Sequence, residues 1–355
     1  MLAENAAGEF QPVNNSKEYR VAIVGATGLV GETMIKVLEE RNFPVSELHL
    51  LASNRSVGKR TDFNGRSLPI KELATFDFGQ VDIGLFSPGA EVSREFAPQA
   101  AAAGCIVIDN TSEFRYYDDV PLIVPEVNPH VIGQYKNRRI IANPNCSTIQ
   151  LVVALKPIHD AVGIERINVA TYQSVSGAGR EAVEELAQQS ITLLSGKGPV
   201  EPHVIPKQIA FNCVPQIDRF EDNGYTREEM KMVWETRKIL EDPTIRINAT
   251  AVRVPVFYGH SEAVSIETRT KITPEEARAL LEKAPGVQVM DERRPGGYPT
   301  AATEAANRDT VYVGRIRQDA STERGLNLWV VADNVRKGAA TNSIQIAELL
   351  ALQPI

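Results

Sequence analysis

Short runs of β-branched residues alternate with longer amphipathic segments along the first part of the chain. Apolar side chains recur about every second residue in a strand and about every 3.6 residues in a helix, so the two patterns can be told apart. We predict strands over Tyr19–Val24, Leu48–Ala52, Asp82–Phe86 and Cys105–Asp109, and helices over Gly28–Arg41 and Ser93–Ala103. Strands that alternate with helices form parallel sheets, so this region predicts a doubly wound α/β domain.

After about residue 146 the predicted strands are longer and their alternation is clearer. We predict strands over Ile167–Gln173, Ile247–Phe257, Glu262–Thr270, Val311–Gln318 and Leu326–Ala332, and helices over Glu181–Leu194, Arg227–Leu240 and Pro274–Lys283. Two of these helices begin with a capping-box pattern, Thr226 with Glu229 and Thr273 with Glu276. The pattern predicts an α+β domain with a largely antiparallel mixed sheet.

The predicted elements divide the chain into a tail and two domains. Residues 1–18 lack the basic and apolar regions of a signal peptide and predict a polar, poorly ordered tail. Residues 19–145 predict the α/β domain, and residues 146–333 the α+β domain. A last predicted helix, about Ala339–Leu350, lies in the segment 334–355, which we expect to return to the first domain.

Composition and charge narrow the class of protein. The chain has 355 residues, of which 43% are hydrophobic and 23% charged, a profile typical of soluble globular proteins. No apolar run approaches the roughly 18–20 residues that span a bilayer, so we expect a cytoplasmic protein without a membrane partner. The net charge is −7 and no Lys/Arg block is present, which argues against a nucleic-acid partner.

A glycine-rich string follows the first predicted strand and opens the first predicted helix. Glycines at this place let a pyrophosphate approach backbone N–H groups at a helix N-terminus. The spacing is GxxGxxG rather than GxGxxG, and a purely structural turn is the alternative. The candidate cofactor-binding residues of this string are Gly25, Ala26, Thr27, Gly28, Leu29, Val30 and Gly31.

The end of the second predicted strand indicates which dinucleotide binds. An NAD enzyme usually has an acidic residue there for the ribose 2′-hydroxyl. This chain has Ser53, Arg55 and Ser56 instead, which suit a 2′-phosphate. The pattern favours NADP over NAD, with an ordinary solvated turn as the alternative.

Three cysteines, an odd number without close spacing, predict neither a disulfide framework nor a metal site. Cys146 stands among polar, turn-forming residues where a strand gives way to a helix over Thr148–Ile158. A helix N-terminus favours an anion, so this thiol is expected to ionise more easily than a free cysteine. Cys105 and Cys213 fit the commoner pattern of a small buried hydrophobic residue.

A nucleophilic thiol needs an acid–base partner, and His260 is the best placed of five histidines. It falls in the turn between two predicted strands, where catalytic groups collect. Arg253 lies a few residues earlier and shares the face of Ala249 and Ala251, so it is placed to bind a carboxylate. The other four histidines are interpreted as structural.

With these residues in view, the chain resembles aspartate-semialdehyde dehydrogenase from about Tyr19 to Leu350. The resemblance is carried, in the order of the family, by GATGLVG at 25–31, ASNRS at 52–56, IDNTSEFR at 108–115, VPEVN at 124–128, NPNCST at 143–148, TYQSVSGAGR at 171–180, EEMK at 228–231, RVPVFYGHSE at 253–262 and DNVRKGAATNSIQIAELL at 333–350. It implies a Rossmann NADP-binding domain and a catalytic and dimerisation domain. The protein is then expected to form a homodimer or a homotetramer.

The resemblance also implies a role for each matching residue. Cys146 is the nucleophile, His260 the general acid/base and Gln173 a positioning group. Substrate and phosphate are bound by Arg253 for the α-carboxylate, Glu228 for the ammonium, and Arg115, Asn145 and Lys231 for the phosphate. Ser176, Gly177 and Asn342 are implied to seat the nicotinamide half of NADP.

The implied reaction is the reversible, NADPH-dependent conversion of aspartyl phosphate to aspartate semialdehyde and inorganic phosphate through a cysteine thioester. It belongs to lysine, threonine and methionine biosynthesis. Two alternatives stay open. One is N-acetyl-γ-glutamyl-phosphate reductase, in whose acetylated substrate Glu228 has no ammonium to bind. The other is a non-catalytic NADP-binding paralogue.

Overall fold

The computed structural model describes residues 17–353, so nearly all of the predicted tail 1–18 lies outside the described residues. The chain divides into two units. The segments up to Asn145 and from Ala339 onward form the first unit, and Cys146–Gly338 forms the second.

The first unit is built on a seven-stranded sheet. Its strand order is β3-β4-β2-β1-β5-β6-β7, and every pairing except that of β3 with β4 is parallel. The strands are β1 (Tyr19–Val24), β2 (Val45–Ala52), β3 (Arg60–Phe63), β4 (Arg66–Glu72), β5 (Ile83–Phe86), β6 (Ile106–Asp109) and β7 (Ile140–Ala142), and the helices are α1 (Leu29–Glu40), α2 (Ala90–Ala102) and α7 (Thr341–Ala351). The predicted doubly wound fold is confirmed.

Helices cover both faces of this sheet, and its strands β5, β6 and β7 are buried along their whole length. Ile23 and Ile108 point to one face, where they pack in one core cluster with α1 and α7. Asp109 points to the other face and accepts a 2.8 Å hydrogen bond from Ser93 of α2. The strand order reverses between β1 and β5, and the crevice at such a point is where ligands of open α/β sheets bind.

The second unit is built on a six-stranded sheet of order β11-β12-β13-β10-β8-β9. Three of its five pairings are antiparallel and two are parallel, as predicted for a mixed, largely antiparallel sheet. The strands are β8 (Ile164–Gln173), β9 (Arg246–Arg253), β10 (His260–Thr268), β11 (Val287–Val289), β12 (Val311–Gln318) and β13 (Gly325–Ala332), and the helices are α3 (Cys146–Val162), α4 (Arg180–Leu194), α5 (Arg227–Ile239) and α6 (Pro274–Leu281).

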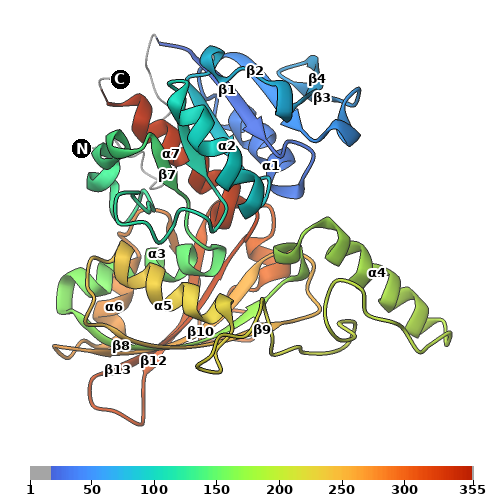
Figure 1. The fold of residues 1–355 in the computed structure, drawn as a ribbon. Coiled ribbons are helices and arrows are strands. Elements are labelled where there is room, and N and C mark those ends of the chain that lie inside the picture. Colours follow the sequence, from blue (N-terminus) through green and yellow to red (C-terminus); the bar gives the residue numbers. More distant parts are fainter. Residues whose placement is uncertain (1–16, 354–355) are drawn as a thin grey trace. The chain divides into compact units, whose positions relative to one another are not determined.

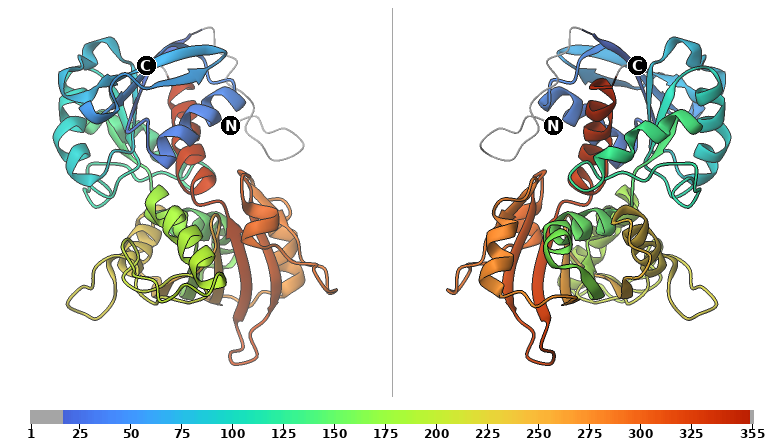
Figure 2. Two further views of the ribbon diagram at one scale, coloured as in Figure 1. Left: turned by 90° about the vertical axis from the view of Figure 1, so that its right-hand side faces the viewer. Right: turned by 90° about the vertical axis from the view of Figure 1, so that its left-hand side faces the viewer.

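Three helices of this unit, α3, α5 and α6, lie on one face of the sheet (Figure 1), and Figure 2 shows the same arrangement from the side. Because helices cover one face of the sheet, buried and partly exposed side chains alternate along much of β10. His260, Glu262 and Val264 face the helices and are buried, whereas Ser265 and Glu267 on the other face are partly exposed. Side chains that point toward the helices therefore form the interior of this unit.

Several predicted strand ends differ from the structure, and two of the corrections concern the candidate site. The strand predicted over Ile247–Phe257 ends at Arg253, because Pro255 has no N–H to donate to a neighbouring strand. The strand predicted from Glu262 begins at His260, which pairs with Ala332 of β13. His260 is therefore a strand residue and does not lie in the preceding turn.

The prediction for Cys213 is also wrong, since this cysteine is exposed. Its segment is a turn rather than a strand or helix, and Phe211 there has a positive φ of 58° and is itself exposed. The apolar neighbour Val214 is buried, but the thiol of Cys213 beside it is not. Cys105 is buried as predicted, and burial raises the pKa of its thiol to about 12.

Both predicted capping boxes are confirmed, and the one on α5 reaches beyond its own helix. Glu229 accepts a 2.7 Å hydrogen bond from the N–H of Thr226 and a 2.9 Å bond from the N–H of Ala251 in β9. The second box, Thr273 with Glu276 on α6, is exposed and local. Glu229 thus joins the start of α5 to the sheet, which orients the neighbouring residue Glu228 toward the interior.

We predict that Glu229→Ala lowers the free energy of unfolding by about 2–3 kcal/mol. It removes a helix cap and leaves two buried N–H groups without a partner. Denaturant unfolding measures the loss. Glu276→Ala is the matched control, because it removes the equivalent cap at an exposed position and is expected to cost clearly less. Equal losses in the two variants would contradict the role of Glu229 in joining α5 to the sheet.

Candidate active site

A thiol and an imidazole from distant parts of the chain meet in the second unit. The Sγ atom of Cys146 lies 3.3 Å from Nε2 of His260. Cys146 is the first residue of α3 and is partly exposed, whereas His260 opens β10 and is fully buried. Cys146 therefore lies partly exposed at a helix N-terminus, where the backbone N–H groups favour an anion.

The imidazole of His260 is fixed on its second nitrogen as well. Nδ1 accepts a 3.1 Å hydrogen bond from the backbone N–H of Ser174, the residue after β8. Burial lowers the pKa of His260 to about 3, helped by the positive charge of Arg253 and opposed by Glu228 and a backbone hydrogen bond to Gly259. The ring is therefore neutral at physiological pH.

Arg253 ends β9 on the same face of the sheet. Its Nη1 donates a 2.8 Å hydrogen bond to the carbonyl of Ser174, and its side chain is buried. Burial lowers the pKa of Arg253, while the negative charges of Glu228 and Cys146 raise it. A Cβ on Gly177 would lie 2.8 Å from this Nη1 and 3.3 Å from the His260 ring, so only glycine fits there without a shift.

A polar row on β8 and α5 completes this cluster. Nε2 of Gln173 donates to Oγ of Ser147 at 2.8 Å and to Oε1 of Glu228 at 3.2 Å. Glu228 and Lys231 lie one turn apart on α5 and are paired at 3.1 Å, as their spacing predicts, and Lys231 also contacts Asp218 at 2.8 Å. An acid and a base thus stand beside each other near the thiol.

The glycine string of the first unit opens a pocket of about 530 Å³ at the carboxyl ends of β1, β2 and β5. Gly25 has a φ of 86°, and a Cβ there would lie 2.6 Å from the carbonyl oxygen of Ser87. A Cβ on Gly31 would lie 2.2 Å from the carbonyl oxygen of Gly25. These two glycines are therefore required for α1 to start close to the sheet, which leaves its N-terminal N–H groups accessible to a phosphate.

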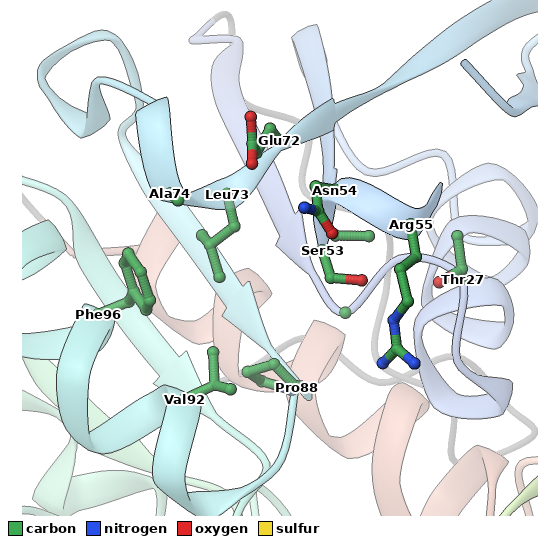
Figure 3. A pocket seen from close by; sticks show the side chains of 12 residues that line it. Thr27, Ser53, Asn54, Arg55, Glu72, Leu73, Ala74, Pro88, Val92 and Phe96 are labelled. Atoms are coloured by element: carbon green, nitrogen blue, oxygen red, sulfur yellow. The ribbon is translucent and has the colours of Figure 1, made fainter. Parts of the chain in front are cut away.

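The far end of this pocket carries the residues that follow β2. Figure 3 shows Ser53, Arg55 and Thr27 across the pocket from Val92 and Phe96. Ser56 does not line the pocket, but its hydroxyl lies 3.5 Å from that of Thr27. Glu72 at the end of β4 lines it as well, and the sequence pattern did not indicate this residue because β4 itself was not predicted. The pocket suits a nucleotide and is lined by one basic residue, Arg55, and one acidic residue, Glu72.

The other predicted residues lie in the two units as follows. Arg115 and Asn342 are buried in the first unit, where Arg115 donates to the carbonyl of Asn110 at 2.9 Å and Asn342 donates to Oδ1 of Asn143 at 2.7 Å. Asn145 directly precedes Cys146 in the chain. Ser176 belongs to the second unit, where its hydroxyl lies 3.1 Å from that of Ser174.

Three polar residues that contact the predicted site were missed. Ser147 holds Gln173, Ser174 holds the His260 ring, and Asn334 accepts from Ser174 Oγ at 3.0 Å. Each stands next to, or one residue from, the end of a buried strand or the start of a helix. A polar residue at such a place can indicate a site in the sequence. Its hydrogen-bond partners cannot be predicted in this way, because they lie on segments far away in the chain.

A fourth missed residue, Glu262, is fully buried two residues after His260 on the same face of β10. It lies opposite Thr171 of β8 and Val330 of β13. Gln150 of α3 is its polar neighbour, but among the described residues neither carboxyl oxygen has a partner at hydrogen-bond geometry. Burial raises the pKa of Glu262 well above its usual value, so burial favours the neutral, protonated form of this side chain.

Known proteins share this architecture. A family model for the NAD binding domain of semialdehyde dehydrogenase matches residues 20–135, and one for the semialdehyde dehydrogenase dimerisation domain matches residues 155–337. These matches define the class as a semialdehyde dehydrogenase with a nucleotide-binding domain, which is an oxidoreductase.

Individual relatives narrow the class further. The aspartate-semialdehyde dehydrogenase of Legionella pneumophila is 63% identical over 94% of this chain and 96% of its own. Aspartate-semialdehyde dehydrogenase 2 of Vibrio cholerae is 61% identical over 94% and 98%. The chain belongs to the aspartate-semialdehyde dehydrogenase family.

Solved structures show the same fold. The crystal structure of aspartate semialdehyde dehydrogenase II from Vibrio cholerae, complexed with ASA, superposes with a TM-score of 0.94 at 59% identity and covers 96% of this chain and all of its own. That of aspartate semialdehyde dehydrogenase with NADP from Candida albicans gives a TM-score of 0.72 at 26% identity, covering 94% and 98%.

Two kinds of feature are absent from residues 17–353. No helix in that range is long and apolar enough to cross a membrane. The same range holds no group of three or more His, Cys, Asp or Glu side chains arranged to bind a metal ion.

We predict that Glu262→Gln gains thermal stability relative to the wild type as the pH rises. In the unfolded chain the carboxyl group loses its proton near about pH 4.3, whereas the folded chain keeps it to a higher pH. The folded state then binds more protons, so the wild type loses stability as the pH rises from about 4.3 toward the folded pKa, and glutamine has no such loss.

Melting temperatures measured between about pH 4 and pH 8 test this difference. Glu267→Gln, on the less buried face of the same strand, is the matched control for removing one carboxyl group. A difference between Glu262→Gln and the wild type that stays constant with pH would show that Glu262 is not held as a neutral acid.

Proposed function

We propose that this protein reduces aspartyl phosphate to aspartate semialdehyde with NADPH, releases inorganic phosphate, and also runs the reverse reaction. The observation that carries the proposal is the 3.3 Å pair of Cys146 and His260, with Cys146 partly exposed at a helix start. The named relatives, at up to 63% identity over nearly the whole chain, support the choice of substrate.

Cys146 is the proposed nucleophile. Its thiolate attacks the acyl carbon, a C–S bond forms, and the C–O bond to phosphate breaks to leave a thioester. When bound, NADPH supplies the hydride that makes the thioester carbon an aldehyde carbon, and the C–S bond then breaks to release the product. The covalent step divides one difficult reaction into two easier ones. His260 is the proposed acid–base group for the acyl oxygen and the sulfur.

The remaining side chains are proposed to bind the substrate. Arg253 holds the α-carboxylate, and Glu228 holds the ammonium. Their burial beside Cys146 strengthens both interactions. Gln173 positions the reacting group from its bond to Ser147. Lys231 receives the phosphate together with Arg115 and Asn145.

NADP rather than NAD is the proposed cofactor. The pocket at the end of β2 carries the cation Arg55 and the hydroxyl of Ser53, which suit a 2′-phosphate. Gly25 lets the chain pass close to the backbone of Ser87, and the N–H groups at the start of α1 are the proposed contacts of the pyrophosphate. Ser176, Gly177 and Asn342 are the proposed contacts of the nicotinamide half.

The proposed assembly is a homodimer, with a homotetramer as the larger possibility, through the region that matches the dimerisation domain at residues 155–337. Small molecules are the proposed substrates, and the proposed location is the cytoplasm, where an amino-acid biosynthetic enzyme meets them.

We expect phosphate-dependent reduction of NADP by the purified protein when aspartate semialdehyde is supplied. Absorbance of NADPH measures the rate, with and without inorganic phosphate. N-acetylglutamate semialdehyde is the comparison substrate and is expected to react far more slowly, because Glu228 has no ammonium to bind. Faster turnover of the acetylated substrate would contradict the proposal.

Cys146→Ser is expected to lower kcat by at least about 10³-fold while NADP binding is retained, because a serine hydroxyl is a poor nucleophile without a strong base. Cys213→Ser is the matched control, since that thiol is exposed outside this site. Its kcat should stay near that of the wild type. Turnover near wild type in Cys146→Ser would rule out the thioester.

Arg55→Leu is expected to raise the KM for NADP by about tenfold or more and to leave the KM for NAD nearly unchanged. A charged contact to the 2′-phosphate is lost, and NAD has no such phosphate. Initial rates at varied NADP and NAD measure both values. Equal effects on the two cofactors would place Arg55 away from the 2′-phosphate.

A further inference from the structure

The two ring nitrogens of His260 face partners of different kinds. Nε2 faces the sulfur of Cys146 at 3.3 Å, and Nδ1 faces the backbone nitrogen of Ser174 at 3.1 Å. A backbone N–H can only donate, so Nδ1 must offer its single lone pair. A hydrogen on Nδ1 would point at that N–H. The ring hydrogen of a neutral imidazole therefore belongs on Nε2.

The hydroxyl of Ser174 also lies 3.1 Å from Nδ1, and its role depends on Asn334. The backbone N–H of Gly259 donates to Oδ1 of Asn334 at 3.0 Å, which fixes the orientation of this amide. Ser174 Oγ donates to the same Oδ1 at 3.0 Å. The hydroxyl hydrogen is thus engaged with Asn334, and the backbone N–H remains the donor to the ring.

Asn334 connects three segments that surround the imidazole. It joins the residue after β8, the turn before β10 and the residues after β13, through Ser174, Gly259 and its own backbone. It also donates to Ser176 Oγ at 3.0 Å. All of these groups are buried or part of buried backbone, so their hydrogen bonds are not exchanged for water.

The charge state of the ring is set by the groups packed against it. Full burial and the positive charge of Arg253 from β9 disfavour a second proton on the ring. Glu228 from α5 and a backbone hydrogen bond to Gly259 favour one, and the pKa of His260 is lowered to about 3. Cys146 from α3 is the remaining titratable neighbour. A single hydrogen is therefore present near neutral pH.

We propose that the backbone of Ser174, held by Asn334, fixes His260 as the neutral tautomer with its hydrogen on Nε2. His260 then donates a hydrogen bond to the Cys146 sulfur in the resting enzyme and does not take the thiol proton, which goes to solvent at the partly exposed sulfur. Asn334 is a positioning residue, since it acts through Ser174 and Gly259.

The catalytic part of this inference rests on the proposed function and restricts the role proposed there for His260. The ring acts on the acyl oxygen, and the sulfur loses its proton to solvent and not to His260. During the reaction the same Nε2–H group donates to the acyl oxygen as negative charge develops there. A neutral imidazole held in this way stabilises an oxyanion without first gaining a proton. A low pKa suits a histidine to this role, because the ring stays a neutral donor throughout the working pH range.

Nitrogen NMR of the protein labelled with ¹⁵N-histidine, without substrate or cofactor, tests the tautomer directly. His260→Asn identifies the ring signals by their disappearance from the spectrum. We expect a protonated Nε2 and an unprotonated Nδ1, constant from about pH 6 to pH 8. A protonated Nδ1, or an imidazolium in that range, would overturn the proposal. The result does not depend on turnover, so failure of the proposed reaction and failure of this inference are separate outcomes.

Ser174→Ala separates the two possible partners of Nδ1. The variant keeps the backbone N–H and loses the hydroxyl, so the ring signals should keep the wild-type pattern. A change to a protonated Nδ1, or a mixture of tautomers, would show that the hydroxyl sets the tautomer and that the backbone does not.

Asn334→Ala and Asn334→Asp test the positioning role. Alanine removes the acceptor of Ser174 and Gly259, so the ring signals should broaden or divide between tautomers and kcat should fall by about tenfold. Aspartate keeps an acceptor oxygen and should restore the single tautomer. Unchanged ring signals and kcat in Asn334→Ala would remove Asn334 from the proposal.

Discussion

The contact between Cys146 and His260 depends on the N-terminus of α3 meeting the first residue of β10. The two residues are 114 positions apart, yet their reacting atoms lie 3.3 Å from each other. The sheet makes this possible, because β10 pairs with β8 on one side and β13 on the other, and α3 packs against all three strands. Gln173 and Arg253 end β8 and β9 of the same sheet, and Glu228 and Lys231 come from α5, which packs against β9.

Burial then determines what each polar group can do. Burial keeps His260 neutral and raises the pKa of Glu262, and Arg253 places a positive charge beside the thiol. Low dielectric strengthens every hydrogen bond in such a cluster and makes each missing one costly. Backbone groups supply hydrogen bonds to these buried side chains. The N–H of Ser174 donates to Nδ1 of His260, and the N–H of Gly259 donates to Oδ1 of Asn334.

The first unit shows how a short local motif can position a ligand. Gly25 and Gly31 allow α1 to begin against the sheet, where a Cβ on either residue would meet backbone atoms. The pocket beyond them takes its lining from segments that follow β1, β2, β4 and β5. The glycines are recognisable in a single string, but Glu72 and Phe96 enter the pocket only through the sheet order and the path of α2.

Features that involve neighbouring residues could be predicted from the amino-acid sequence. The structure agrees with five predictions that depend on residues close together in the chain. They are the limits of β1, the limits of β12, both capping boxes, the glycine string and the face of Arg253. Other features became known only from the folded chain. They are the position of His260 in a strand, the exposure of Cys213, and the hydrogen bonds of Ser174 and Asn334. These features depend on which distant segments pack together, because burial and hydrogen-bond partners are properties of the folded neighbourhood and not of the local pattern.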